Sequence, residues 1–140
     1  MTEPRATGRC LCGAVRYDVR GPLRDVLVCH CVECRRWSGH LGAFSAAREG
    51  DLVLLDDRTL RWIDSPESDR GARRGFCGEC GSSLFWRAAD GDRIHIAAGT
   101  LDRPTGLQVA GHGGVSDAVD WDEPLDGLPR AIDAAELRWS

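Results

Sequence analysis

The sequence contains no lysine and no asparagine, and all 18 of its basic residues are arginine. Without lysine the chain cannot use an amine nucleophile, a lysine Schiff base or a P-loop lysine. Without asparagine it cannot build a catalytic triad that contains that residue. A basic complement made wholly of arginine also favours a GC-rich bacterial origin.

Long apolar runs are absent as well. The longest apolar-rich stretch, Val26–Val32, is too short to span a bilayer and includes His30. Residues Met1–Arg9 lack the apolar stretch of an export signal. We therefore expect a cytoplasmic protein with no membrane partner, in a compartment where thiols stay reduced.

Acidic residues outnumber basic ones by 22 to 18, which gives a formal net charge of −4. This balance argues against a nucleic-acid partner, because nucleic-acid binding needs a concentrated basic face. The length of 140 residues predicts one domain that covers residues 1–140.

Short apolar segments, separated by glycine, proline and aspartate, predict a mainly β domain. The expected strands are Leu11–Val19, Leu23–Cys29, Asp51–Leu55, Thr59–Ile63, Gly75–Cys77, Ser82–Ala88 and Arg93–Ala97. Val32–Trp37 is the one short stretch expected to form a helical turn.

Seven cysteines fall into three clusters, and these clusters carry the chemical signal. The first and last are short pairs, each followed by glycine, and together they predict a closed structural zinc site. Three cysteines remain in a C-x-C-x-x-C arrangement, which is expected of a catalytic zinc with an open fourth position. The predicted structural ligands are Cys10, Cys12, Cys77 and Cys80, and the predicted catalytic ligands are Cys29, Cys31 and Cys34.

Two other interpretations of the cysteines stay open. They could form disulfides, although seven is an odd number and the expected compartment is reducing. The chain could also hold a single structural zinc beside three ordinary buried thiols. His30 is expected to be a neighbour of the middle cluster rather than a ligand, because it follows Cys29 directly and would point the other way in extended chain.

Three segments resemble the glutathione-dependent formaldehyde-activating enzyme family, also called Gfa-like or centromere-protein-V-like. They read G-x-C-x-C-G-x-x-x-Y from Gly8 to Tyr17, C-H-C-x-x-C-R-R-x-S-G from Cys29 to Gly39, and F-C-x-x-C-G-S-x-L from Phe76 to Leu84. The tail, with His112, Trp121 and Asp126-Gly127-Leu128-Pro129, is also similar. The resemblance covers about residues 8–130.

The resemblance implies a fold of the β-tent type with the same division into two zinc sites. It also implies a carbon–sulfur lyase that acts on a thiol adduct such as S-hydroxymethylglutathione, with glutathione or another small thiol as partner. A non-catalytic, zinc-stapled binding module is the alternative, since some relatives have that role.

Three residues beside the middle cluster are expected to contact the substrate. Arg35 and Arg36 could bind a glycyl carboxylate, and Trp37 could form a wall of the pocket. The arginines could instead simply cover the sheet surface. His30 stands where formaldehyde-active relatives carry glycine, so we expect formaldehyde condensation to be weak or absent. The larger side chain could narrow the pocket or serve an unrelated proton transfer.

Overall fold

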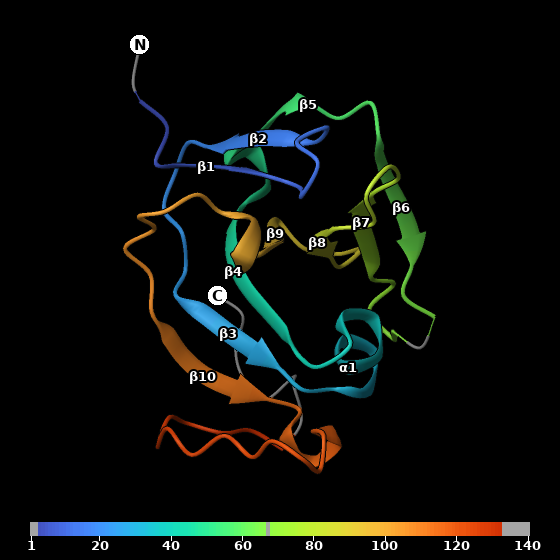
Figure 1. Cartoon of the computed structure of the whole chain (residues 1–140), viewed down its shortest axis with the longest axis vertical. Coiled ribbons are helices and arrows are strands. Elements are labelled where there is room, and N and C mark those ends of the chain that lie inside the picture. The colour runs from blue at the N-terminus through green and yellow to red at the C-terminus, as the bar shows by residue number, and fades with distance from the viewer. Residues whose placement is uncertain (1–2, 67, 133–140) are drawn as a thin grey trace.

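The computed structural model describes residues 3–66 and 68–132, and its strands form two sheets (Figure 1). The smaller sheet has the order β1-β2-β5 and the larger one the order β10-β3-β4-β9-β8-β7-β6. The strands are β1 Ala6–Arg9, β2 Arg16–Val19, β3 Val26–Cys29, β4 Gly42–Arg48, β5 Leu52–Asp56, β6 Leu60–Asp64, β7 Arg73–Cys77, β8 Ser83–Arg87, β9 Arg93–Ala97 and β10 Val109–Gly113.

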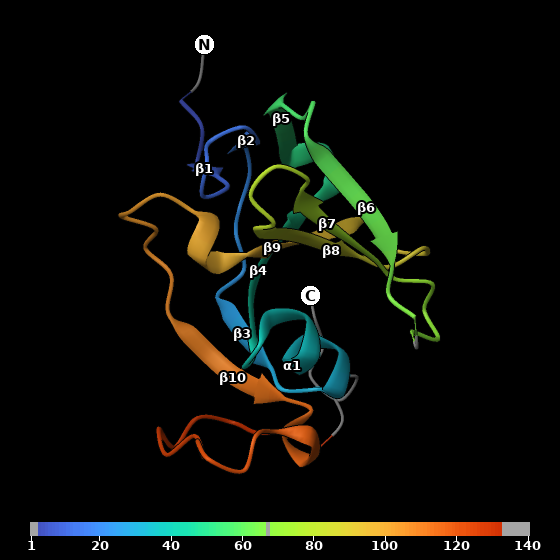
Figure 2. The same ribbon diagram turned by 45° about the vertical axis from the view of Figure 1, so that its right-hand side comes forward.

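One α-helix, α1 (Val32–Ser38), is found in the described part of the chain. It follows β3 almost directly and ends at Gly39, whose φ of 84° suits a residue without a Cβ. In both views α1 lies between β3 and the β6–β8 end of the larger sheet (Figures 1 and 2). This position brings the helix beside residues of β7 that are distant in sequence.

The main core forms where β2 of the smaller sheet packs on β8 and β9 of the larger one. Tyr17 and Phe85 are fully buried and meet edge to face, with ring centroids 5.3 Å apart. The Tyr17 hydroxyl lies 2.7 Å from Oγ1 of Thr100, so its polar atom has a partner. Gly8 pairs with Tyr17, and a Cβ at residue 8 would collide with the tyrosine ring.

The expected mainly β fold is confirmed, and α1 confirms the expected helical turn. The prediction of one strand over Leu11–Val19 is wrong, because residues 10–15 form a turn and β2 begins at Arg16. The strand expected from Leu23 begins at Val26. Strands β1, β4 and β10 were not expected from the sequence.

The missed strands have physical reasons. Strand β4 buries small residues, Ser45, Ala46 and Ala47, so it lacks an alternating apolar pattern. Strand β10 has the sequence V-A-G-H-G, which lacks a strand-like apolar pattern. It pairs in parallel with β3, which is far away in the sequence, so local residues do not predict the pairing. Among the described residues, no helix has the length and apolar character needed to cross a membrane.

Candidate metal centres and the pocket beside them

Two similar turns build the first cysteine cluster. The Gly13 N–H donates to the carbonyl of Cys10, and the Gly81 N–H donates to the carbonyl of Cys77. Both glycines have positive φ, 80° and 77°, which lets each turn close tightly. Each turn thereby directs its pair of cysteines toward the other pair.

The geometry of this cluster fits zinc. Four sulfur ligands at about 2.3 Å from a tetrahedral ion lie roughly 3.8 Å from one another. The Cys10–Cys12 sulfur distance is 3.6 Å and the Cys12–Cys77 distance is 3.8 Å. All four sulfur atoms, those of Cys10, Cys12, Cys77 and Cys80, lie within 4.8 Å of one another. The cluster joins the β1–β2 turn to the β7–β8 turn.

The second cluster forms where β3 passes into α1. Cys29 ends β3, Cys31 is the N-cap residue of α1, and Cys34 is buried in the helix beside Phe44. Their sulfur atoms also lie within 4.8 Å of one another. Cys29 and Cys34 are buried, whereas Cys31 is partly exposed. Three sulfur donors fit a zinc ion that retains one further coordination position.

The second cluster favours a thiolate even before a metal is considered. Hydrogen bonds from Cys29 and Cys34, helped by backbone N–H groups of Cys34 and Glu33, lower the pKa of Cys31 to about 2. The contacts with Cys31 and Cys34, together with burial, raise the pKa of Cys29. The cluster thus concentrates its first negative charge on the most exposed of its three sulfurs.

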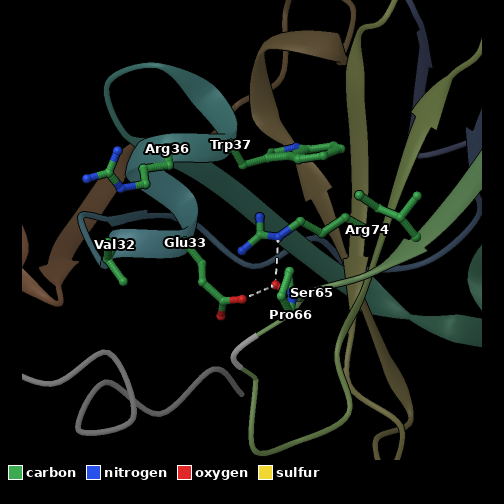
Figure 3. A pocket seen from close by; sticks show the side chains of 8 residues that line it. Val32, Glu33, Arg36, Trp37, Ser65, Pro66 and Arg74 are labelled. Atoms are coloured by element: carbon green, nitrogen blue, oxygen red, sulfur yellow. Dashed lines mark hydrogen bonds between the residues drawn. The ribbon is translucent and has the colours of Figure 1, made fainter.

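A pocket of about 420 Å³ lies between α1 and the β6–β7 end of the larger sheet. None of the three cysteines lines it, and Arg74, which does, connects it to the Cys34 sulfur. Figure 3 shows the side chains that line it, with Trp37 and Arg74 among those labelled. The eight lining residues are Val32, Glu33, Arg36, Trp37, Ile63, Ser65, Pro66 and Arg74. The helix therefore supplies Cys34, and its N-cap position Cys31, to the cluster, while other residues of the same helix form a wall of the pocket.

The residues expected at the substrate have different positions. Arg36 and Trp37 line the pocket, and Arg35 is not among its lining residues. Trp37 is held by a 2.9 Å hydrogen bond from its Nε1 to Oγ of Ser83. Arg36 is exposed, and its guanidinium extends away from Arg74 (Figure 3).

Arg74 is a residue of this site that sequence reasoning missed. Its guanidinium is buried, and its Nη2 lies 3.5 Å from the Cys34 sulfur. Arg74 is the second residue of β7, 40 positions from Cys34, and no local motif distinguishes it from the other arginines. The F-C-x-x-C segment after Arg74 predicts ligands of the four-sulfur cluster. It does not indicate that an arginine just before it faces the three-sulfur cluster.

Two of the histidines form a pair in the structure. Nε2 of His30 lies 3.0 Å from Nδ1 of His112, and Nε2 of His112 lies 2.7 Å from Oδ2 of Asp126. The Asp126 carboxylate accepts from Nε2–H of His112, so in neutral His112 the Nδ1 atom accepts from Nε2–H of His30. The hydrogen bond from His112 also lowers the pKa of Asp126.

His30 is not a member of the three-sulfur cluster, as the sequence predicts. His30 does not narrow the pocket beside α1. His30 is 2% exposed, faces His112 and is not a lining residue. His40 pairs instead with Asp122, at 3.0 Å, and His95 packs edge-on against Trp86.

The fold and these clusters define a class of small, mainly β proteins with one four-cysteine and one three-cysteine cluster, both suited to zinc. Comparison with known proteins gives the family. The family model for the glutathione-dependent formaldehyde-activating enzyme matches residues 5–113, and the chain belongs to this family. Membership links the chain to glutathione-related, formaldehyde-activating or related chemistry.

Solved structures agree on the fold. The crystal structure of a Rhodobacter sphaeroides protein, a structural genomics target, has a TM-score of 0.57 and 21% sequence identity to this chain. The match covers 89% of this chain and 98% of the other. At this identity the likeness concerns the fold alone. No curated protein matches the chain.

Proposed function

We propose that the protein is a carbon–sulfur lyase-type enzyme that acts on a small thiol adduct, with S-hydroxymethylglutathione synthesis as the reference reaction. The observation that carries this proposal is the three-sulfur cluster beside a pocket. A purely structural site needs neither an open ligand position nor an adjoining pocket. The family match supports the same chemistry.

The cluster suits thiol capture better than carbonyl activation. Zinc held there would supply one open position at which an incoming thiol is kept ionised at neutral pH. Three cysteine thiolates give a divalent site a net negative charge, so a fourth thiolate needs a cation nearby. The guanidinium of Arg74, 3.5 Å from the Cys34 sulfur, meets that need.

The reference reaction balances without a redox partner. The thiolate sulfur attacks the carbonyl carbon of formaldehyde, and a carbon–sulfur bond forms. The π pair of the carbonyl moves to oxygen, which takes up one proton in place of the proton that the thiol lost. The product is a hydroxymethyl thioether, and the lyase direction is the reverse.

Exchange NMR of glutathione and ¹³C-formaldehyde, with zinc-loaded protein, tests this proposal. Because His30 does not line the pocket beside α1, we expect turnover in place of the weak condensation that the sequence alone predicts. The protein should accelerate interconversion of free and thiol-bound formaldehyde, with glutathione or with another small thiol. Cys34→Ser should abolish the acceleration because it removes one of three sulfur donors. Arg48→Gln, which removes an exposed charge at the end of β4, is the control and should retain it.

The alternative, a non-catalytic zinc-stapled module, gives a different result. In that case the zinc-loaded protein accelerates exchange for none of the thiols, and Cys34→Ser changes nothing but metal content. This outcome would overturn the proposed enzyme.

A further inference from the structure

Arg74 carries a buried hydrogen-bond donor that no described residue satisfies. Arg74 is 3% exposed, and its Nη1 has no hydrogen-bond partner within the described residues. The Nε of the same side chain donates to Oγ of Ser65 at 3.1 Å, and Nη2 faces the Cys34 sulfur at 3.5 Å. A buried guanidinium donor without an acceptor is costly, so a site that keeps one is arranged for an acceptor that comes from outside.

The guanidinium is also held in place. Ser65 donates its hydroxyl proton to Oε1 of Glu33 at 2.7 Å, so its oxygen is oriented to accept from Arg74. The Trp37 ring lies over the guanidinium, and Cζ of Arg74 is 5.8 Å from the ring centroid. Figure 3 shows Arg74 between the Trp37 ring and Ser65. The free Nη1 therefore has a defined direction rather than a range of rotamers.

The pocket indicates the chemistry of the acceptor. Arg74 lines it, and so do the apolar side chains of Val32, Ile63 and Pro66. This combination fits a short hydrocarbon segment that ends in an oxyanion. Glu33 lines the same pocket, so a singly charged carboxylate is repelled less than a doubly charged phosphate.

We propose that Arg74 selects thiols that carry a carboxylate: Nη1 binds the carboxylate in the pocket while Nη2 faces the Cys34 sulfur. The proposal rests on the proposed function, because it assumes that a thiol is captured at the three-cysteine cluster. One guanidinium would then connect the two ends of the substrate. In this proposal the carboxylate binds mainly to Arg74, and not to Arg35 or Arg36 as the sequence alone predicts.

Two matched thiols test the selection. Isothermal titration of zinc-loaded protein with 3-mercaptopropionate and with 3-mercaptopropanol compares a carboxylate with a neutral hydroxyl of similar length. We expect about tenfold tighter binding of the acidic thiol, the size of one good hydrogen bond to a charged group. In Arg74→Gln this preference should fall to about one. Arg48→Gln, which removes an exposed arginine charge, should keep it.

A competition on the wild-type protein does not depend on whether Arg74→Gln folds. Excess acetate, which has a carboxylate and no thiol, should weaken the apparent binding of 3-mercaptopropionate and leave 3-mercaptopropanol unaffected. Equal binding of the two thiols, or no selective effect of acetate, would overturn the carboxylate role while thiol capture survives. Failure of both thiols to bind would overturn the proposed function and this inference together.

Discussion

Substituting one buried cysteine in each cluster tests whether the two clusters have different roles. Cys77 is fully buried and Cys34 is 5% exposed, so Cys→Ser makes the same chemical change at nearly equal burial. Cys77 belongs to the four-sulfur cluster and Cys34 to the three-sulfur cluster. We expect the zinc-loaded Cys77→Ser protein to be much less stable than Cys34→Ser.

The magnitude follows from the length of chain that each cluster closes. The four-sulfur cluster joins Cys12 to Cys77, which are 65 positions apart. A cross-link over such a loop restricts the unfolded chain by about 4 kcal/mol in the chain-entropy relation. The three-sulfur cluster spans Cys29 to Cys34, and the same relation gives only about 2 kcal/mol.

Thermal melts of the zinc-loaded proteins, followed by far-UV circular dichroism, measure the difference. For a domain of this size a loss of about 4 kcal/mol lowers the Tm by roughly 10 to 20 °C. Cys34→Ser should lower the Tm by no more than about half of that. Equal losses in the two variants would refute the division into a structural and a functional site.

Three further predictions concern metal content, a glycine turn and acid stability. Gently purified protein should hold up to two zinc ions, and mild chelation should remove one while the circular dichroism spectrum is retained, because a closed site exchanges slowly. Gly114→Ala should destabilise the protein by about 1–3 kcal/mol in denaturant melts, since φ is +64° and a Cβ would lie 2.8 Å from the Cys31 nitrogen. Gly127→Ala, with φ of +73° and open space around it, is the control and should lose less. His95→Gln should reduce the loss of stability on acidification from pH 7 to 5.5, measured by urea unfolding at each pH.

The direction of the last effect follows from linkage. Burial, with smaller contributions from the charges of Arg24, Arg70 and Arg93, lowers the pKa of His95 from 6.5 to about 3. Between these values the unfolded chain binds a proton that the folded chain excludes. The stability that neutral His95 gives is complete above pH 6.5 and falls by at most about 1.4 kcal/mol per pH unit toward pH 3.

Each of these predictions has an outcome that contradicts it. Loss of both zinc ions in one step, together with unfolding, would show that the sites are not independent. Equal destabilisation by the two glycine substitutions would assign the whole effect to positive φ rather than to contact with Cys31. An unchanged pH slope in His95→Gln would show that another group governs acid stability.

The sequence by itself determined the fold class and the division of the cysteines. Ligand spacing within each cluster is local, and a glycine after each short pair, Gly13 and Gly81, marks the same tight turn. Because zinc needs four ligands, two pairs that cannot each fill a site are expected to combine. The helical turn after Cys31 could also be predicted, because it depends on residues that are neighbours in the sequence.

Only the tertiary structure decided what surrounds the three-sulfur cluster. Arg74 meets Cys34 because β7 and α1 pack together, and His112 meets His30 because β10 runs parallel to β3. These partners are 40 and 82 positions apart, and each is one arginine or histidine among several. Contacts of that kind depend on strand order and register, which the periodicity of a single sequence does not specify.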